Sequence, residues 1–200
     1  ILDAQHELKQ AYRAYEHRDM DQAMRHARRA HFSGKNDKKI KSRALNLQYN
    51  IAVRLGHPET AIEILDRAIR VDPRCGLCYL RRGDLKYGQK KFVAARDDFK
   101  TGFETISSVK PATRAYYYAR QGLSHLAVGD TEHALAAARN ALQLDPESPL
   151  VFFLRSRIQD SLGDLDGAHE SVLEAYRLGR KQTGFFSSPE GDRWLRYYAD

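Results

Sequence analysis

The stretch RLGHPETAIEILDRAIRVDP at residues 54–73 recurs in altered form as VGDTEHALAAARNALQLDP at residues 128–146. A third copy of its opening, LGDLDGA, stands at residues 162–168. Each copy has a glycine at its second or third residue, which a mostly polar run follows, and the two longer copies end in Asp-Pro. Glycine permits the positive φ of a tight turn, and proline stops a helix. The stretch therefore predicts a turn followed by a helix, repeated along the chain.

A period of 34 residues places five repeats at 4–37, 42–75, 76–109, 115–148 and 149–182. Two positions of this frame hold a small residue in every repeat. At the twentieth position these are Ala23, Ala61, Ala95, Ala134 and Ala168, and at the twenty-seventh Ala30, Ala68, Gly102, Ala141 and Ala175. Small side chains let two helices approach closely. The eighth position is also small in four repeats, whereas the second repeat has Tyr49 there.

This pattern resembles the tetratricopeptide repeat family, whose unit is an antiparallel helix pair of about 34 residues. The resemblance implies an all-α fold, a right-handed superhelical solenoid of five antiparallel helix pairs with a C-terminal capping helix. It is weakest in repeats one and three, where Arg18 and Lys90 replace the glycine of the turn. We expect the turn aspartates to cap the second helix of their pairs. These aspartates are Asp130, Asp164 and Asp166.

The tail, residues 183–200, is predicted to be a loop and a short C-terminal capping helix. Ser188 is a plausible N-cap because Pro189 follows it at the first helical position. Trp194, Tyr197 and Tyr198 then form one apolar stripe that would cover the end of the fifth repeat. Alternatively, the stripe docks on another molecule, including a second copy of the chain. We expect a monomer or a weak homo-oligomer.

The composition, 42% hydrophobic and 30% charged, is that of a folding domain rather than of a disordered or low-complexity chain. No apolar run approaches the roughly 20 residues that a membrane-spanning helix needs, so we expect no membrane span. The first residue is Ile1 rather than methionine, which is compatible with a removed leader. We therefore expect a cytoplasmic location by default, with export left open.

The net charge of +7 is concentrated in one segment, residues 24–43. This segment contains a single acidic residue, Asp37, and eight basic ones. The basic residues are Arg25, Arg28, Arg29, Lys35, Lys38, Lys39, Lys41 and Arg43. They are either a solvated helix end with an exposed linker, or a binding site for nucleic acid or an anionic surface.

Motifs of enzyme active sites are missing from the sequence: it has no P-loop, no G-x-G-x-x-G and no H-E-x-x-H string. The eight histidines are scattered, and we interpret them as surface or packing residues. Cys75 and Cys78 are at best half of a zinc site, and the redox interpretation of such a pair needs a βαβ context. We therefore predict no enzyme, no metal site and no cofactor, and leave open whether the cysteines are bridged.

The family resemblance implies that the first helices of the pairs line a concave groove that binds partners. The residues predicted to line it are Asn46, Asn50, Arg81, Tyr87, Tyr116, Arg120, Phe153 and Arg157. Arg81 and Arg120 share the sixth repeat position, and an arginine fork suits a carboxylate or a peptide backbone. Alternatively, they pair with acidic neighbours such as Asp84 and keep the groove soluble.

The function predicted from these patterns is a non-catalytic adaptor that binds a peptide or helix of another protein in this groove. One alternative is binding of nucleic acid or an anionic surface through residues 24–43. Such binding would weaken steeply with salt because phosphate contacts release counterions. The other alternative is self-assembly through the C-terminal tail.

Overall fold

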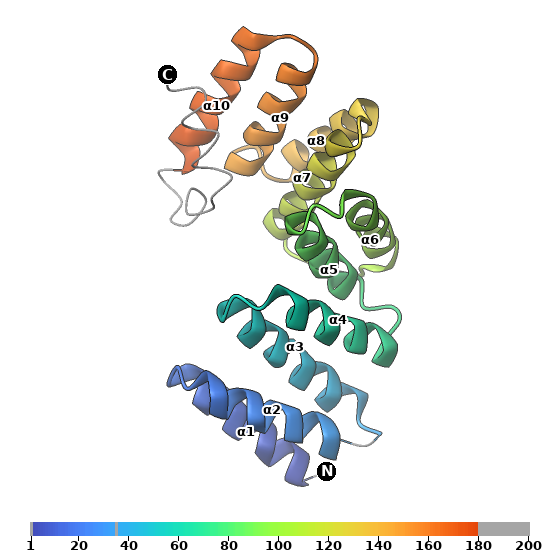
Figure 1. The fold of residues 1–200 in the computed structure, drawn as a ribbon, viewed down its shortest axis with the longest axis vertical. Helices are drawn as coiled ribbons and strands as arrows, with labels where there is room; N and C mark the ends of the chain where they lie inside the picture. Colours follow the sequence, from blue (N-terminus) through green and yellow to red (C-terminus); the bar gives the residue numbers. More distant parts are fainter. Residues whose placement is uncertain (1, 35, 180–200) are drawn as a thin grey trace. The chain divides into compact units, whose positions relative to one another are not determined.

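A computed structural model describes residues 2–34 and 36–179 of the chain. These residues form ten α-helices and no strand (Figure 1). The helices are α1 (Leu2–Glu16), α2 (Met20–Ser33), α3 (Lys38–Arg54), α4 (Pro58–Val71), α5 (Gly76–Gly88), α6 (Phe92–Thr105), α7 (Pro111–Ala127), α8 (Thr131–Leu144), α9 (Pro149–Ser161) and α10 (Leu165–Gly179). The all-α class predicted from the sequence is confirmed. The predicted tail helix within 183–200 lies outside the described residues.

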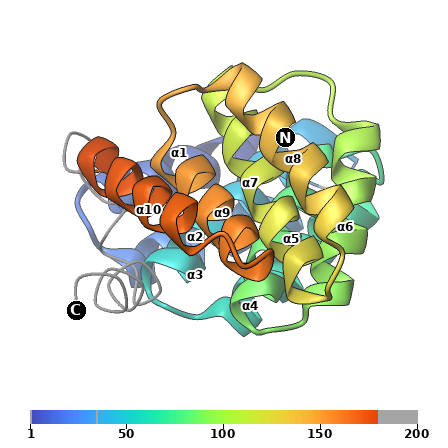
Figure 2. The same cartoon turned by 90° about the horizontal axis from the view of Figure 1, so that it is seen from above.

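Consecutive helices form hairpins: α1 packs on α2, α3 on α4, α7 on α8 and α9 on α10. First helices of neighbouring pairs also touch, α1 with α3 and α7 with α9. The hairpin of α9 and α10, in orange and red, can be followed from a second direction in Figure 2. Among the described residues, no helix combines the length and the apolar character needed to cross a bilayer.

The chain divides into two compact units. Unit 1 comprises Ile1–Leu85 with Lys100–Ile106, and unit 2 comprises Lys86–Phe99 with Ser107–Asp200. The boundary runs through α5 and α6, so each of these helices contributes to both units. The two units are described separately below.

Five helix pairs turn through a residue with positive φ at the fifteenth position of the repeat frame. These residues are Gly56 (72°), Gly129 (81°), Gly163 (80°), Arg18 (61°) and Lys90 (60°). The arginine and the lysine adopt the left-handed conformation that glycine adopts elsewhere, at a cost of about 1 kcal/mol each. The turn geometry is therefore retained where the glycine signal is absent from the sequence.

Aspartate caps follow three of these turns. After Arg18, Asp19 accepts a hydrogen bond from the Gln22 amide at 2.9 Å. Asp130 accepts a hydrogen bond from the His133 amide at 3.2 Å, and Asp164 accepts one from the Gly167 amide at 3.0 Å. Both expected caps are therefore present. The expectation for Asp166 is wrong, because it lies inside the first turn of α10 rather than before it.

Small residues allow the helices to pack closely. The five alanines at the twentieth repeat position are all fully buried. Gly102 of α6 faces Leu80 of α5 so closely that a Cβ on the glycine would lie 2.6 Å from the leucine Cδ2. A buried polar contact also joins two helices, because the Gln48 side-chain amide of α3 donates to the Ala27 carbonyl of α2 at 3.1 Å.

Candidate peptide-binding groove

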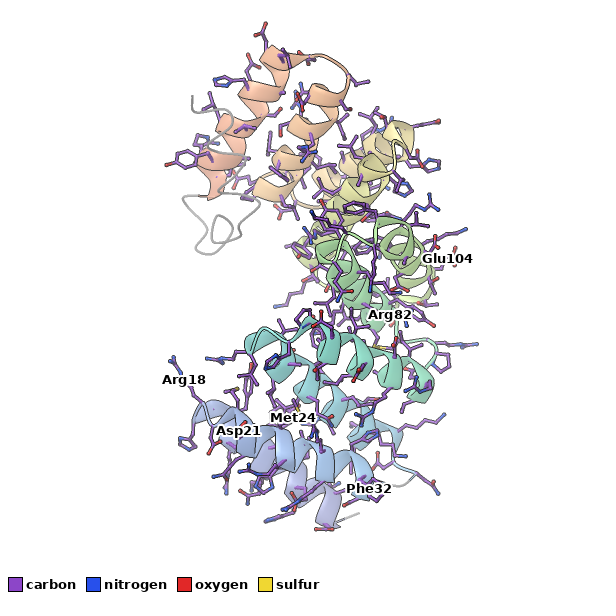
Figure 3. The ribbon with its side chains drawn as sticks, viewed as in Figure 1. Arg18, Asp21, Met24, Phe32, Arg82 and Glu104 are labelled. Carbon is purple, nitrogen blue, oxygen red and sulfur yellow. A yellow bond between two sulfur atoms is a disulfide. The ribbon has the colours of Figure 1, made fainter. Side chains whose placement is uncertain are left out.

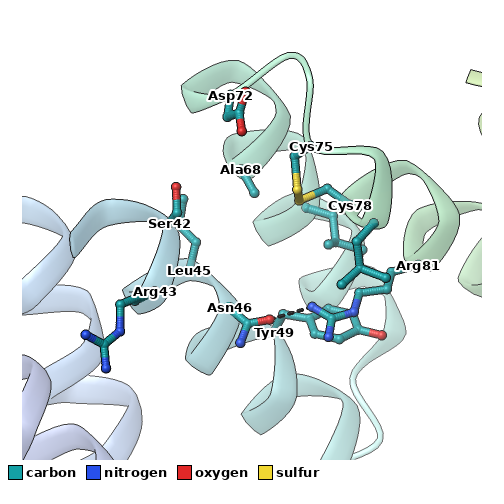
Figure 4. Close-up of a pocket in the computed structure, with 12 residues that line it drawn as sticks. Ser42, Arg43, Leu45, Asn46, Tyr49, Ala68, Asp72, Cys75, Cys78 and Arg81 are labelled. Atoms are coloured by element: carbon teal, nitrogen blue, oxygen red, sulfur yellow. Dashed lines mark hydrogen bonds between the residues drawn. A yellow bond between two sulfur atoms is a disulfide. The ribbon is translucent and has the colours of Figure 1, made fainter. Parts of the chain in front are cut away.

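Arg81 of α5 is held by two side chains of α3. Its Nη1 donates to Asn46 Oδ1 at 2.5 Å, and its guanidinium carbon lies 4.7 Å from the centre of the Tyr49 ring (Figure 4). The hydrogen bond fixes one end of the guanidinium, and the aromatic face attracts the cation. Arg81 is therefore oriented before any ligand arrives.

The Tyr49 ring beneath Arg81 stays uncharged at neutral pH. Burial raises the pKa of the Tyr49 hydroxyl above its usual value of 10.0, and this outweighs the opposing effect of the Arg81 charge. A neutral phenol adds no negative charge of its own beside Arg81. The guanidinium therefore remains available to attract an anion.

Arg81 borders a cavity of about 380 Å³ between α3, α4 and α5 (Figure 4). Leu45, Leu65 and Leu77 line it with apolar surface, and Arg43 lies on the other side. Cys75 and Cys78 also line it and are joined by a disulfide. The sequence left the state of these cysteines open. Because they are bridged in this structure, they present a disulfide rather than two thiolates to the cavity.

A second hollow of about 510 Å³ lies between α1 and α3 and shares Arg43 with the first. The guanidinium of Arg43 lies 5.8 Å from the centre of the Tyr12 ring. Basic residues outnumber acidic ones along this hollow. The charged residues that line it are Lys9, Arg13, Lys39 and Arg43 against Glu16 and Asp37. Unit 1 therefore carries two adjoining hollows with a surplus of positive charge.

Arginine over tyrosine recurs outside these hollows. In unit 1, Arg54 lies 5.5 Å from the Tyr15 ring centre and Arg82 lies 5.3 Å from that of Tyr79. In unit 2, Arg114 lies 5.9 Å from the Tyr118 ring centre and Arg120 lies 4.2 Å from that of Tyr87. Tyr87 also contacts Phe92, with ring centres 5.3 Å apart. Stacking on tyrosine is thus a general mode of arginine packing in this chain.

The other residues predicted to line the groove differ from one another in how deeply they are buried. Asn50 is half-buried one turn after Asn46 on α3, and Arg157 is half-buried on α9. Tyr116 is exposed and meets the Tyr117 ring edge-on at 5.2 Å. Phe153, which is predicted to line the groove, is packed in the core of unit 2. Helix α9 is buried on much of its circumference, and the repeat frame alone did not reveal this.

The basic segment 24–43 is divided between two helices. On α2, Arg25, Arg28 and Arg29 are exposed, and Phe32 at the end of that helix is 87% exposed (Figure 3). On α3, the basic residues begin at the first turn. Lys38, Lys39 and Arg43 are exposed and Lys41 is half-buried, while Lys35 lies outside the described residues. Lys39 and Arg43 line the second hollow, so part of the basic segment belongs to the candidate groove.

The structure also brings together a group that sequence spacing did not reveal. His125 Nδ1 lies 3.0 Å from Asp130 Oδ2, and His133 Nδ1 lies 2.8 Å from Asp130 Oδ1. Burial lowers the pKa of His125, whereas hydrogen bonds from His133 first, and from His125, hold the pKa of Asp130 at about 2. The two histidines are on different helices, so the one-helix spacing test could not detect them. Tyr49 was also missing from the predicted groove residues, although the sequence marks it: at the eighth repeat position it stands where the other repeats have a small residue.

Comparison with known proteins identifies the repeats. The profile described as Tetratricopeptide repeat matches residues 47–101 and 119–183, more than half of the chain. One curated relative, described as "Probable serine/threonine-protein kinase BSK3" of Oryza sativa subsp. japonica, is 34% identical over 94 residues. The match involves 47% of this chain and 18% of that protein, so the chain spans less than a fifth of the relative's length.

Solved structures share the fold at low sequence identity. MamA (41-end) from Desulfovibrio magneticus RS-1 has a TM-score of 0.74 at 20% identity, covering 91% of this chain and 98% of that one. BtubC from P. vanneervenii has a TM-score of 0.70 at 17% identity, covering 90% and 80%. A thermophilic TPR protein of Thermus thermophilus, TTC0263, has a TM-score of 0.58 at 20% identity, covering 90% and 93%. Repeats of this kind form protein-interaction modules. The chain belongs to the tetratricopeptide repeat family.

Proposed function

We propose that the chain is a non-catalytic adaptor that binds an extended acidic segment of a partner protein along the first helices of unit 1. The observation that carries this proposal is Arg81, which Asn46 and Tyr49 orient beside an apolar-walled cavity. Solenoids of stacked helix pairs bind through the surface formed by repeated helices. The ligand therefore meets a fixed cation rather than a mobile surface side chain.

The chemistry of this surface suits a carboxylate. A guanidinium has five N–H donors, so the hydrogen bond to Asn46 leaves donors that can fork onto two carboxylate oxygens. The leucines of the cavity can accommodate an apolar side chain next to that carboxylate. Lys39 and Arg43 in the adjoining hollow favour further acidic residues along the same segment. The carboxylate can belong to a side chain or to a C-terminus.

Binding of nucleic acid through residues 24–43 is the second candidate. The observation that favours it is Phe32, an exposed aromatic ring on the same helix as Arg25, Arg28 and Arg29. An aromatic ring among cations can stack on a base while the cations contact phosphates. We rank it below peptide binding because Lys39 and Arg43 face the peptide-sized hollow. A steep loss of affinity with salt would mark this mode.

A display library of random peptides, half with free and half with amidated C-termini, tests the first proposal. Selection on the whole chain should enrich acidic peptides, and Arg81→Glu should lose them while its circular dichroism stays that of the wild type. Comparison of free and amidated peptides identifies which carboxylate is bound. Enrichment without acidic residues, or equal binding by Arg81→Glu, would contradict the proposal. Self-assembly through residues 183–200 is tested separately. If it occurs, deletion of the tail should reduce the number of chains per particle in solution.

A further inference from the structure

A compact group of two imidazoles and one carboxylate lies at the turn between α7 and α8 in unit 2. His125 comes from the last turn of α7, Asp130 from the turn itself and His133 from the first turn of α8. The two imidazole rings lie nearly parallel, with centres 5.1 Å apart and planes 15° from each other. Each carboxylate oxygen of Asp130 faces one Nδ1. We propose that His125, Asp130 and His133 bind a divalent transition-metal ion of the zinc class.

The donor atoms have a composition and spacing that suit such an ion. One donor atom from each residue lies within 4.8 Å of the other two. Imidazole nitrogen together with carboxylate oxygen suits Zn²⁺, Ni²⁺ and Cu²⁺. Metal–ligand bonds of about 2.0–2.2 Å in a tetrahedral site separate neighbouring ligand atoms by about 3.3–3.5 Å. The nitrogen–oxygen distances of 2.8 and 3.0 Å run to different oxygens of Asp130. Binding therefore needs these contacts to open by a few tenths of an ångström and the widest separation of donor atoms, up to 4.8 Å, to close toward the tetrahedral value.

The backbone holds the three residues in place. The Asp130 amide donates to the His125 carbonyl at 3.0 Å, and the Ala134 amide donates to the Asp130 carbonyl at 3.2 Å. The turn is closed at Gly129, whose φ is 81°. The His125 side chain is 12% exposed and the His133 side chain 67% exposed. One ligand is therefore fixed by packing, while the other leaves an entry path and room for water as a further ligand.

The equivalent turn between α9 and α10 shows that these histidines are not required by the turn. There Asp164 accepts from the Gly167 amide and from the Gln159 side chain, each at 3.0 Å. Gln159 and Gly167 occupy the repeat positions of His125 and His133. A capping aspartate and a neutral amide thus suffice to hold the turn. The pair of histidines supplies donor atoms that the turn itself does not need.

The metal site departs from the sequence-based expectation of no metal. His125 and His133 are eight residues apart and on two helices, and the hairpin brings them together. A bound ion would link the end of α7 to the start of α8. The free energy of unfolding would therefore rise with the logarithm of the ion concentration once that concentration exceeds the dissociation constant.

Titration of the untagged full chain with Zn²⁺, and with Co²⁺ for its visible absorption, tests the proposal near neutral pH. We expect one ion per chain and a higher thermal midpoint. His133→Gln should weaken binding by about 10-fold or more, since removal of a single ligand or its support has effects of that order. Because the His133 side chain is exposed, we expect His133→Gln to fold like the wild type. His26→Gln is the matched control and should leave binding unchanged, because within the described part of the chain His26 pairs with a single carboxylate, that of Glu7 at 2.6 Å.

A gain-of-site variant tests the same inference in the opposite direction. Gln159→His combined with Gly167→His places two imidazoles around Asp164, and this variant should bind a second ion. A Cβ at residue 167 would lie 2.3 Å from Asp164 Oδ2 and from Gln159 Nε2. Because the variant replaces Gln159, only the end of the Asp164 side chain has to shift to make room. Absence of stoichiometric binding by the wild type, or equal binding by wild type and His133→Gln, would overturn the proposal. Loss of binding in His26→Gln would also overturn it.

Discussion

Arg81 in unit 1 and Arg120 in unit 2 occupy the same position of the repeat frame but have different surroundings. Arg81 lies over Tyr49 and donates to Asn46 beside a cavity of about 380 Å³. Arg120 lies over Tyr87, closer to its ring centre at 4.2 Å against 4.7 Å for Arg81. Asn46 stands at the fifth position of the repeat that precedes Arg81. The same position of the repeat that precedes Arg120 holds Leu80, which is fully buried.

The difference separates the features that the repeats share from those that one repeat has alone. The frame places an arginine on the first helix, and a tyrosine from the preceding pair stacks on it in both units. At Arg81 the preceding pair also supplies an amide oxygen, that of Asn46, which orients the guanidinium beside a lined cavity. We therefore propose that Arg81 binds the ligand, and we expect Arg120, which stacks on Tyr87, to contribute less to binding.

Charge reversal at the two arginines should separate these roles with the largest effect. With one selected acidic peptide, Arg81→Glu should weaken binding by more than about 100-fold, because it removes a charge-assisted fork and adds repulsion. Arg120→Glu should change the affinity by less than about threefold. Isothermal titration calorimetry measures both. Equal losses in the two variants would show that the comparison is wrong.

Replacing Asn46 by its counterpart residue should make the Arg81 site resemble that of Arg120. Asn46→Leu removes the acceptor that orients the guanidinium but keeps the charge and Tyr49. We expect a loss of about five- to tenfold in peptide affinity, because the guanidinium is no longer held in the orientation that the ligand needs. The exposed position of Asn46 should keep the thermal midpoint unchanged. Unaltered affinity would mean that Asn46 does not orient Arg81.

The turn after Tyr87 offers a smaller test, of stability alone. Lys90 has a φ of 60°, and its amide donates to the Tyr87 carbonyl at 2.8 Å. Lys90→Gly should stabilise the chain by about 1 kcal/mol, because glycine adopts this conformation without a Cβ clash. Gly129→Ala, at the same repeat position, should destabilise it by about 1–2 kcal/mol. Urea unfolding measures both, and a destabilised Lys90→Gly would contradict the explanation.

The pH dependence of stability should be the smallest effect. Burial first, then Arg67 and Lys41, lower the pKa of His31 below 6.5. A histidine with a depressed folded-state pKa contributes stability that is present above the unfolded value and is lost as the pH falls below it. Unfolding at about pH 7 and about pH 5 should therefore show a loss on acidification. His31→Gln should reduce this loss without abolishing it, because burial also lowers the pKa of His125. A loss of the same size in His31→Gln would exclude His31 as a cause.

The repeat pattern was sufficient to predict the all-α class and the family, because small residues and turns recur at fixed positions. Contacts between repeats were harder to predict. The pairing of Arg81 with Asn46 joins residues 35 apart, and the frame brings them near each other without fixing their side-chain rotamers. The frame predicted Phe153 on the groove because it gives the position of a residue along its helix. It does not show how many neighbouring residues cover that position, and Phe153 lies in the core. The group of His125 and His133 depends on a turn that brings two helices together.

The binding of peptide at Arg81 can be tested most directly by NMR. Two-dimensional spectra of the isotope-labelled chain, recorded as a selected acidic peptide is added, report which side chains it contacts. We predict the largest shifts at the Asn46 side-chain amide and the Arg81 Nε–H, with the Arg120 Nε–H nearly unchanged. The largest shifts at Arg28 and Arg29, with Asn46 and Arg81 unmoved, would contradict the assignment and move binding to α2.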